Sequence, residues 1–198
     1  MKRIKSIHFV GIKGVGVAPL AIIAKEAGFS VSGSDIEDEF ITTDSLMRAK
    51  IKPLVGFLEE HVQNADLVIA TSAHGGLENI EVLDAKKREI AVWTQGQAVG
   101  EFMKGKIFGR EFLGISVAGS HGKTTTTAML SIILREGNLD PSFLIGTGNI
   151  PTLGNSGHFG KGKYFIAEAD EYATEPKYDK TPKFLWQHPQ IEIFTNIR

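Results

Sequence analysis

A glycine-rich segment with a lysine and a threonine, Ala118-Gly-Ser-His-Gly-Lys-Thr124, contains the residue types that bind a polyphosphate. It follows an apolar run expected to form a strand and precedes a stretch expected to form a helix, as a phosphate-binding loop requires. Glycines let backbone N–H groups turn toward phosphate oxygens at a helix N-terminus, where the helix dipole favours negative charge. The segment therefore predicts a nucleotide site formed by Gly119, Ser120, His121, Gly122, Lys123, Thr124 and Thr125.

The predicted catalytic residues of this site are Lys123, Thr124 and Glu168. Lys123 is expected to reach the β- and γ-phosphates of ATP, and the Thr124 hydroxyl to join a Mg²⁺ shell. Glu168 opens the acidic segment Glu168-Ala-Asp-Glu171 at the end of a predicted strand, where a carboxylate completes a metal shell in nucleotide-hydrolysing folds. The strict loop pattern has glycine where Val117 stands, so this is a variant loop. The alternatives are a chance Gly-Lys-Thr sequence and a solvated acidic loop.

A second glycine turn follows the first predicted strand, with the pattern GxxGxG in place of the dinucleotide pattern GxGxxG. Backbone amides in such a turn can approach a diphosphate, while Asp35, at the end of the second strand, could accept hydrogen bonds from a ribose or base. Ser72 and His74 follow the fourth strand at its carboxyl end, where open α/β sheets bind ligands. The predicted substrate-binding residues are Gly11, Lys13, Gly14, Val15, Gly16, Asp35, Ser72 and His74. A structural glycine turn and an exposed loop histidine are the alternatives.

The elements that position these residues alternate between short apolar strands and helices, which is typical of βαβ units around a parallel sheet. The expected strands are 4–10, 29–33, 54–55, 67–70, 90–93, 112–118, 143–145, 164–167 and 191–195. The expected helices are 15–27, 44–50, 78–89, 97–103 and 123–136, and residues 146–163 are expected to form a polar loop. The fold class is α/β: a Rossmann-like parallel-sheet domain, followed by the start of a phosphate-binding-loop domain.

A charged stretch with glycines, residues 104–111, separates two runs of strand-then-helix pattern. We therefore expect one domain over 1–103, a linker over 104–111 and a second domain over 112–198. The second domain stops directly after a strand, so we expect it to continue beyond Arg198.

Composition excludes several classes of function. The chain has no cysteine, so thiolate metal sites and disulfides are excluded, and a cytoplasmic location is expected. Its 22 basic and 23 acidic residues nearly cancel, which gives no charge signature for nucleic acid or a membrane surface. No apolar run is long enough to span a membrane.

Taken in order, the motifs resemble those of the muramyl ligases of bacterial cell-wall synthesis. The resemblance rests on five segments in sequence order: HFVGIKGVG at 8–16, VSGSD at 31–35, AGSHGKTTTT at 118–127, EADE at 168–171 and TNI at 195–197. It implies an ATP-dependent ligase that uses Mg²⁺ and activates the carboxylate of UDP-N-acetylmuramate as an acyl phosphate. The first domain would bind the UDP-sugar and the second would bind ATP. A third, C-terminal domain would be absent, so the chain should bind ligands without turning over.

Within this family, the glycine turn and the HGKTTT loop resemble members that attach L-alanine, or recycled murein tripeptide, to UDP-N-acetylmuramate. Ser120 stands where the family usually has threonine, and Arg198 where it usually has an acidic residue. Glu171-Tyr172 and the stretch 178–184 are more similar to the tripeptide enzyme, which leaves the amino acid or short peptide substrate open. Two alternatives of another class remain: a nicotinamide-dependent Rossmann protein and a binding protein without catalysis.

Overall fold

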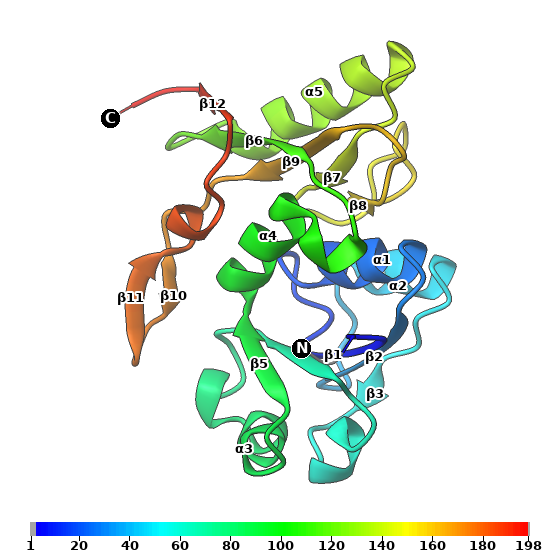
Figure 1. The fold of residues 1–198 in the computed structure, drawn as a ribbon, viewed down its shortest axis with the longest axis vertical. Helices are drawn as coiled ribbons and strands as arrows, with labels where there is room; N and C mark the ends of the chain where they lie inside the picture. The colour runs from blue at the N-terminus through cyan, green and yellow to red at the C-terminus, as the bar shows by residue number, and fades with distance from the viewer. Residues whose placement is uncertain (1–2, 198) are drawn as a thin grey trace.

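The computed structural model describes residues 3–197, so the departure from the family pattern noted at Arg198 lies outside the described residues. The described chain forms two five-stranded sheets, one above the other, with helices on their faces (Figure 1). This confirms the predicted α/β class.

The first sheet is parallel throughout and has the order β3-β2-β1-β4-β5. Its strands are β1 (Ser6–Val10), β2 (Ser30–Asp35), β3 (Leu54–Val55), β4 (Leu67–Ala70) and β5 (Ala91–Thr94). Consecutive strands lie on either side of β1, as in a doubly wound sheet, whose ligands bind beyond the carboxyl ends of the strands. The turns after β1 and β4 therefore lie at the edge that was predicted to bind substrate.

Four α-helices belong to this half: α1 (Ala18–Glu26), α2 (Thr43–Arg48), α3 (Ile80–Lys87) and α4 (Gln95–Lys104). Three 3₁₀ turns accompany them: η1 (Glu59–Val62), η2 (Gly76–Glu78) and η3 (Lys106–Phe108). The prediction started α1 too early, at Val15. The helix begins three residues later because the glycine turn occupies that stretch, and Pro19 suits its first turn. Helix α4 is fixed at its start by a capping box between Thr94 and Gln97.

The second sheet has the order β12-β6-β9-β7-β8, with β8 antiparallel to β7. Its strands are β6 (Leu113–Ala118), β7 (Ser142–Leu144), β8 (Gly157–His158), β9 (Tyr164–Glu168) and β12 (Ile191–Phe194). Helix α5 (Lys123–Glu136) follows β6 directly and has the predicted bounds. The short strand β8 lies within residues 146–163, which were predicted to be loop throughout.

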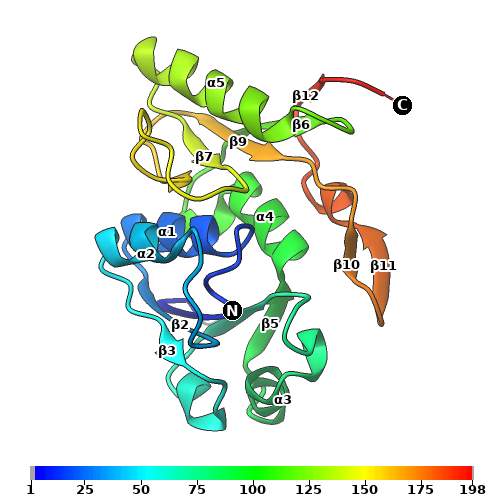
Figure 2. The same ribbon diagram turned by 180° about the vertical axis from the view of Figure 1, so that it is seen from behind.

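The helices α1, α2 and α4 lie between the two sheets, while α3 and α5 lie on the outer faces (Figures 1 and 2). The largest apolar cluster combines side chains of β1, α1 and α4 with Phe165 and Ala167 of β9. The two halves therefore share one continuous core, although a linker between them was predicted from the sequence at 104–111.

A hairpin that the sequence did not predict connects the acidic segment with the last strand. It consists of β10 (Ala173–Glu175), β11 (Asp179–Pro182) and the 3₁₀ turn η4 (Lys183–Trp186), and it lies alongside α4 (Figures 1 and 2). At its tip, Nζ of Lys177 lies 2.6 Å from Oε1 of Glu78 in η2, and the Tyr178 hydroxyl donates to the same oxygen. The hairpin thus bridges the acidic segment and the loop after β4.

A histidine joins the two halves at another point. His158 of β8 lies between Glu26, at the end of α1, and Asp140, with ring nitrogens 2.8 Å and 3.3 Å from their carboxylate oxygens. The hydrogen bond with Glu26 is the main cause of a raised pKa of His158. A protonated imidazole would therefore hold α1 against the second sheet.

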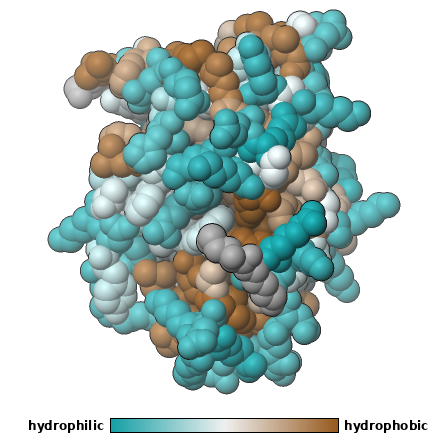
Figure 3. Space-filling view, viewed as in Figure 1, coloured by the Kyte–Doolittle hydropathy of each residue, from teal (hydrophilic) through white to brown (hydrophobic). Residues whose placement is uncertain are grey.

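Exposed apolar side chains gather at the end of the molecule formed by α5 and β12, seen as brown areas at the top of Figure 3. They include Met129 and Ile133 on α5 and Phe194 on β12, which are 57%, 62% and 58% exposed.

None of the helices in the described part of the chain has the length and apolar character needed to cross a bilayer.

Candidate active site between the two sheets

The predicted nucleotide loop lies between β6 and α5, as expected. Gly122 has φ of +81° and Gly119 of +138°, backbone conformations that side-chain-bearing residues rarely adopt. Among the described residues no side chain caps the N-terminus of α5, so its first amide groups are left for another acceptor. Ser120 and His121 are exposed beside this end of the helix, as is Thr125 in its first turn. The loop therefore has the geometry of an anion site.

The segment after β12 holds the loop in place. Thr195 Oγ1 and Asn196 Nδ2 donate to the carbonyl oxygen of His121, at 2.5 Å and 3.1 Å. The Asn196 side-chain oxygen in turn accepts from the His121 backbone amide at 3.2 Å. The Thr-Asn pair, which carried part of the family resemblance, thus positions the backbone of the loop.

Lys123 begins α5 and already has partners. Its ammonium donates to the Gly119 carbonyl at 2.8 Å and to Oε2 of Glu171 at 3.0 Å. The hydrogen bond from Lys123 lowers the pKa of the Glu171 carboxyl. Since Glu171 is 56% exposed, its carboxylate can move away, and a phosphate could then take its place beside Lys123.

Thr124 and Glu168 lie together, as the predicted metal pair requires. The Thr124 hydroxyl donates to Oε2 of Glu168 at 3.0 Å, and the Gly146 amide donates to Oε1 at 2.7 Å. Burial raises the pKa of Glu168, and the neighbouring Asp170 carboxylate adds to this shift. A hydroxyl beside a carboxylate suits Mg²⁺, which prefers oxygen ligands and keeps several waters. Among the residues that the structure describes, no group of three or more histidines and carboxylates could hold a metal alone, so phosphate oxygens and water would complete the shell.

The glycine turn after β1 is built around Asp35. Its carboxylate is 1% exposed and accepts from the backbone amides of Lys13, at 2.7 Å, and Ile36, at 2.9 Å. Gly11 has φ of +71°, and a side chain there would run into Thr71 after β4. The Asp35 carboxylate thus holds the backbone of the turn, and because it is buried it is not accessible to a ribose.

Lys13 was predicted to bind substrate, and we had expected its side chain to assist at the diphosphate, but the structure gives the side chain other partners. It is 6% exposed, and its ammonium donates to the carbonyls of Ile36 at 2.7 Å and Asp38 at 2.8 Å. The carbonyls of the loop after β2 surround it, so it fixes that loop instead of pointing into an open site. A phosphate contact by Lys13 stays a prediction that would require these bonds to be released.

The remaining predicted substrate residues lie where expected, around the turns after β1 and β4. His74 has φ of +52°, packs its ring against Phe57 with centroids 5.3 Å apart, and places Nε2 3.4 Å from Asp35. Ser72 is half-buried on the same loop. Gly14 and the partly exposed Val15 continue the first turn, which ends beside α4 at Gly16.

A cavity of about 280 Å³ joins the two predicted sites. Val15, Gly16 and Gln95 line it from the first half, and Gly146 and Glu168 from the second. A larger hollow of about 740 Å³ lies near Lys5, Phe29 and Lys106, at the amino end of β1 and away from both glycine turns. We assign the site to the smaller cavity because the predicted metal ligand Glu168 and the glycine turn both line it.

Three further polar residues of this cavity, Gln95, Lys183 and Gln187, were not predicted. Gln95 opens α4, and Lys183 opens η4. Neither belongs to a recognisable sequence motif. Only the packing of η4 on α4 brings Lys183 near Glu168.

Comparison with known proteins agrees with this arrangement. Residues 6–107, more than half of the chain, match the family described as Mur ligase family, catalytic domain. The chain belongs to the Mur ligase family.

Curated relatives of this Mur ligase chain include two UDP-N-acetylmuramate–L-alanine ligases. The one from Psychrobacter sp. (strain PRwf-1) is 38% identical over 197 residues, which cover 100% of this chain and 38% of the relative. The one from Desulfitobacterium hafniense (strain Y51) is 38% identical over 192 residues, covering 96% and 39%. The chain thus spans less than two fifths of these relatives.

Solved structures of Mur ligases have the same fold. UDP-N-acetylmuramate:L-alanyl-gamma-D-glutamyl-meso-diaminopimelate ligase from Neisseria meningitides matches with a TM-score of 0.80 and 31% identity, over 98% of this chain and 61% of that one. UDP-N-acetylmuramate-alanine ligase from Thermotoga maritima matches with a TM-score of 0.79 and 26% identity, over 98% and 41%. The likeness covers both sheets and the hairpin, since nearly all of this chain is aligned.

Proposed function

We propose that this chain holds the nucleotide-sugar and ATP sites of a ligase that joins L-alanine to UDP-N-acetylmuramate through an acyl phosphate. One observation carries the proposal: the glycine turn after β1 and Glu168, the hydrogen-bond partner of Thr124, line the same cavity. A carboxylate held from the first half would there meet a phosphoryl group held from the second. The names of the curated relatives support L-alanine as the amine.

The reaction has two steps. A carboxylate oxygen of the sugar attacks the γ-phosphorus of ATP, forming an O–P bond, and the bond to the β–γ bridging oxygen breaks as ADP leaves with the electron pair. The amine then attacks the carbonyl carbon, the C–O bond to phosphate breaks, and the nitrogen gives up a proton. The protein's part is chiefly positioning and charge stabilisation.

Three side chains and two sets of backbone amides have separate roles in this scheme. The Lys123 ammonium, once released from Glu171, would neutralise charge on the phosphoryl oxygens. The Thr124 hydroxyl and the Glu168 carboxylate would hold Mg²⁺, which neutralises phosphate charge when bound. Backbone amides of residues 119–125 would bind the nucleotide phosphates, and those of residues 11–16 the UDP diphosphate.

The division of labour between residues 1–103 and 112–198, with 104–111 as a linker, is part of the proposal. We place the reaction in the cytoplasm, because it consumes ATP and a UDP-sugar. Recycled murein tripeptide is the second candidate for the amine, because the solved tripeptide ligase is also similar to this chain.

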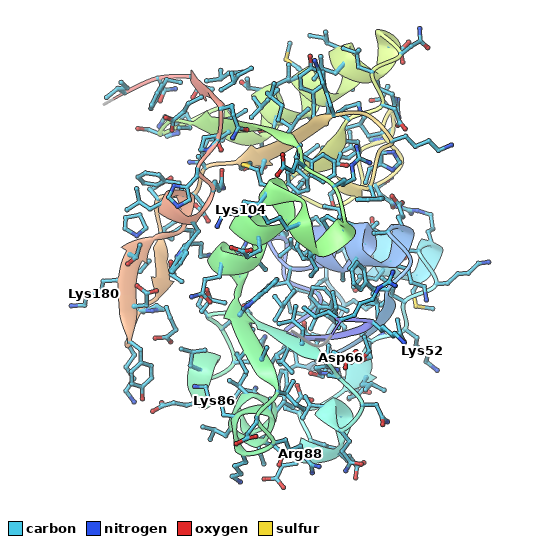
Figure 4. The ribbon with its side chains drawn as sticks, viewed as in Figure 1. Lys52, Asp66, Lys86, Arg88, Lys104 and Lys180 are labelled. Carbon is cyan, nitrogen blue, oxygen red and sulfur yellow. The ribbon has the colours of Figure 1, made fainter. Side chains whose placement is uncertain are left out.

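Isothermal titration of this chain with UDP-N-acetylmuramate, and with NADH as control, tests the first site. Binding of the nucleotide sugar without binding of NADH is expected, and binding of NADH alone would overturn the assignment. For the second site, Lys123→Ala should weaken ATP binding by at least about tenfold, since it removes a charged phosphate contact. The exposed Lys52 lies far from the loop (Figure 4), so Lys52→Ala is the matched control and should leave ATP binding unchanged. Equal affinities in both variants would remove Lys123 from the site.

A further inference from the structure

Lys183 differs from Lys13 and Lys123, whose ammonium groups donate hydrogen bonds to backbone carbonyls. It lines the joint cavity together with Gly16, Gln95 and Glu168, and its side chain is 17% exposed. Within residues 3–197 its ammonium makes no hydrogen bond, and its one ion pair is with Oδ2 of Asp170 at 3.7 Å. That distance is too long for a hydrogen bond.

The position of Lys183 is fixed by its backbone. Its amide donates to the Tyr172 carbonyl at 2.9 Å, and the Phe184 amide donates to the Asp170 carbonyl at 3.0 Å. Three residues on, the indole N–H of Trp186 donates to Thr174 Oγ1 at 2.9 Å. The turn η4 is therefore tied to the acidic segment and to the hairpin.

The turn η4 packs on helix α4 at two glycines. Gly96 and Gly100 are one helical turn apart and face it. A methyl at Gly96 would lie 3.3 Å from Cβ and Cγ of Lys183, and one at Gly100 would lie 2.7 Å from the carbonyl carbon of Trp186. Gly96 leaves room for the stem of Lys183 against α4, and Gly100 leaves room for the backbone of Trp186, so Lys183 can line the cavity.

Gln95, which also lines this cavity, has one polar atom without a hydrogen-bond partner among the described residues. Gln95 donates from Nε2 to the Gly16 carbonyl at 3.2 Å, while its Oε1 is buried without a hydrogen-bond partner among the described residues. A partly buried ammonium that makes no hydrogen bond costs free energy. A ligand with an anionic group would remove this cost by binding Lys183 in the cavity.

We propose that Lys183 binds the carboxylate of the sugar acid and positions it for attack on the phosphoryl group. This inference rests on the proposed function and adds a residue that determines which sugars are accepted. The carboxylate would be held between Lys183 and the first turn of α4, whose dipole also favours negative charge. Lys123 would remain with the nucleotide phosphates.

A pair of nucleotide sugars isolates the contact, because UDP-N-acetylglucosamine lacks the lactyl carboxylate that UDP-N-acetylmuramate carries. Titration of this chain with each sugar should show that Lys183→Met weakens binding of UDP-N-acetylmuramate by about tenfold, as expected for loss of a charged hydrogen bond. Binding of UDP-N-acetylglucosamine should change by less than about twofold. Lys183→Arg keeps the charge and should restore most of the affinity for UDP-N-acetylmuramate.

Lys180→Met is the matched control, because Lys180 lies on β11 of the same hairpin and is exposed, away from the cavity (Figure 4). It should leave both affinities unchanged. Equal weakening of both sugars by Lys183→Met would indicate a structural role and overturn the inference, as would unchanged binding of both. Weaker ATP binding with unchanged sugar binding would assign Lys183 to the phosphate instead. If the unmodified chain binds neither sugar, the proposed function itself fails.

Discussion

Replacing Gly100 with alanine should destabilise this chain, although the same change in most helices is stabilising. Alanine is favoured over glycine inside a helix by about 1 kcal/mol. Here, however, the new methyl would clash with the carbonyl oxygen of Trp186 and lie 2.7 Å from its carbonyl carbon, where ordinary contacts begin at 3.4 Å. The turn η4 would have to retreat by at least about 0.7 Å, because backbone cannot rotate away as a side chain can.

The size of the effect follows from these opposing terms. Overpacking typically costs about 1–3 kcal/mol, and a clash with backbone belongs at the upper end of that range. After the gain in helix propensity, about 2 kcal/mol of net destabilisation remains. With a urea m-value of roughly 2–3 kcal/mol per M, the unfolding midpoint should fall by roughly 0.7–1 M.

Urea unfolding followed by both tryptophan fluorescence and far-ultraviolet circular dichroism measures this change. Two matched glycines serve as controls. At Gly96 the nearest atoms are side-chain atoms of Trp186 and Lys183 at 3.2–3.3 Å, so Gly96→Ala should be nearly neutral. At Gly137, which ends α5, a methyl would meet carbonyl oxygens at 3.4 and 3.5 Å and should be tolerated. A higher midpoint for Gly100→Ala would refute the packing of η4 on α4.

Three further predictions concern charged groups. Glu171→Gln removes the partner that occupies Lys123, so ATP affinity measured by titration should rise by about two- to fivefold, and an unchanged affinity would exclude competition. The pKa of His158 is raised above 6.5 by its hydrogen bond with Glu26, so its stabilising contribution is complete below that value and is lost as pH rises through the raised pKa. Calorimetry should therefore show a Tm deficit for His158→Gln of at most about 3 °C near pH 6, which disappears at alkaline pH, and a deficit independent of pH would refute this reading. Because the pKa of Glu168 is raised by burial, Mg²⁺-dependent ATP binding should weaken as pH falls toward that pKa and should be weak at every pH in Glu168→Gln; equal Mg²⁺ dependence in both proteins would remove Glu168 from the metal site.

The sequence predicted the elements well where apolar patterning dominates. The strand Leu67–Ala70 and the helix Lys123–Glu136 have the predicted bounds, because a continuous buried run and a glycine-to-helix junction both have clear local patterns. The hairpin β10–β11 was missed, since its residues are charged and include Pro176 and Pro182. It is held by tertiary contacts, such as that of Lys177 with Glu78, which no local pattern reveals.

The candidate site was predictable to a similar extent. Spacing alone placed Thr124 and Glu168, 44 residues apart, beside each other, because the carboxyl ends of neighbouring parallel strands meet at one edge. Spacing did not show that the Lys13 ammonium turns inward toward backbone carbonyls, since side-chain direction depends on the loop after β2. Lys183 could not be predicted, because its place in the cavity depends on packing against α4.

The two glycines of α4 also bear on how the protein folds while it is being made. Helix α4 emerges from the ribosome well before residues 183–186, and its two glycines weaken it by roughly 1 kcal/mol each relative to alanine. During synthesis α4 is therefore a weak helix whose glycine-bearing face stays uncovered until residues 183–186 have been translated. The nascent chain can bury its first sheet early, but α4 acquires its final packing only when η4 has been translated.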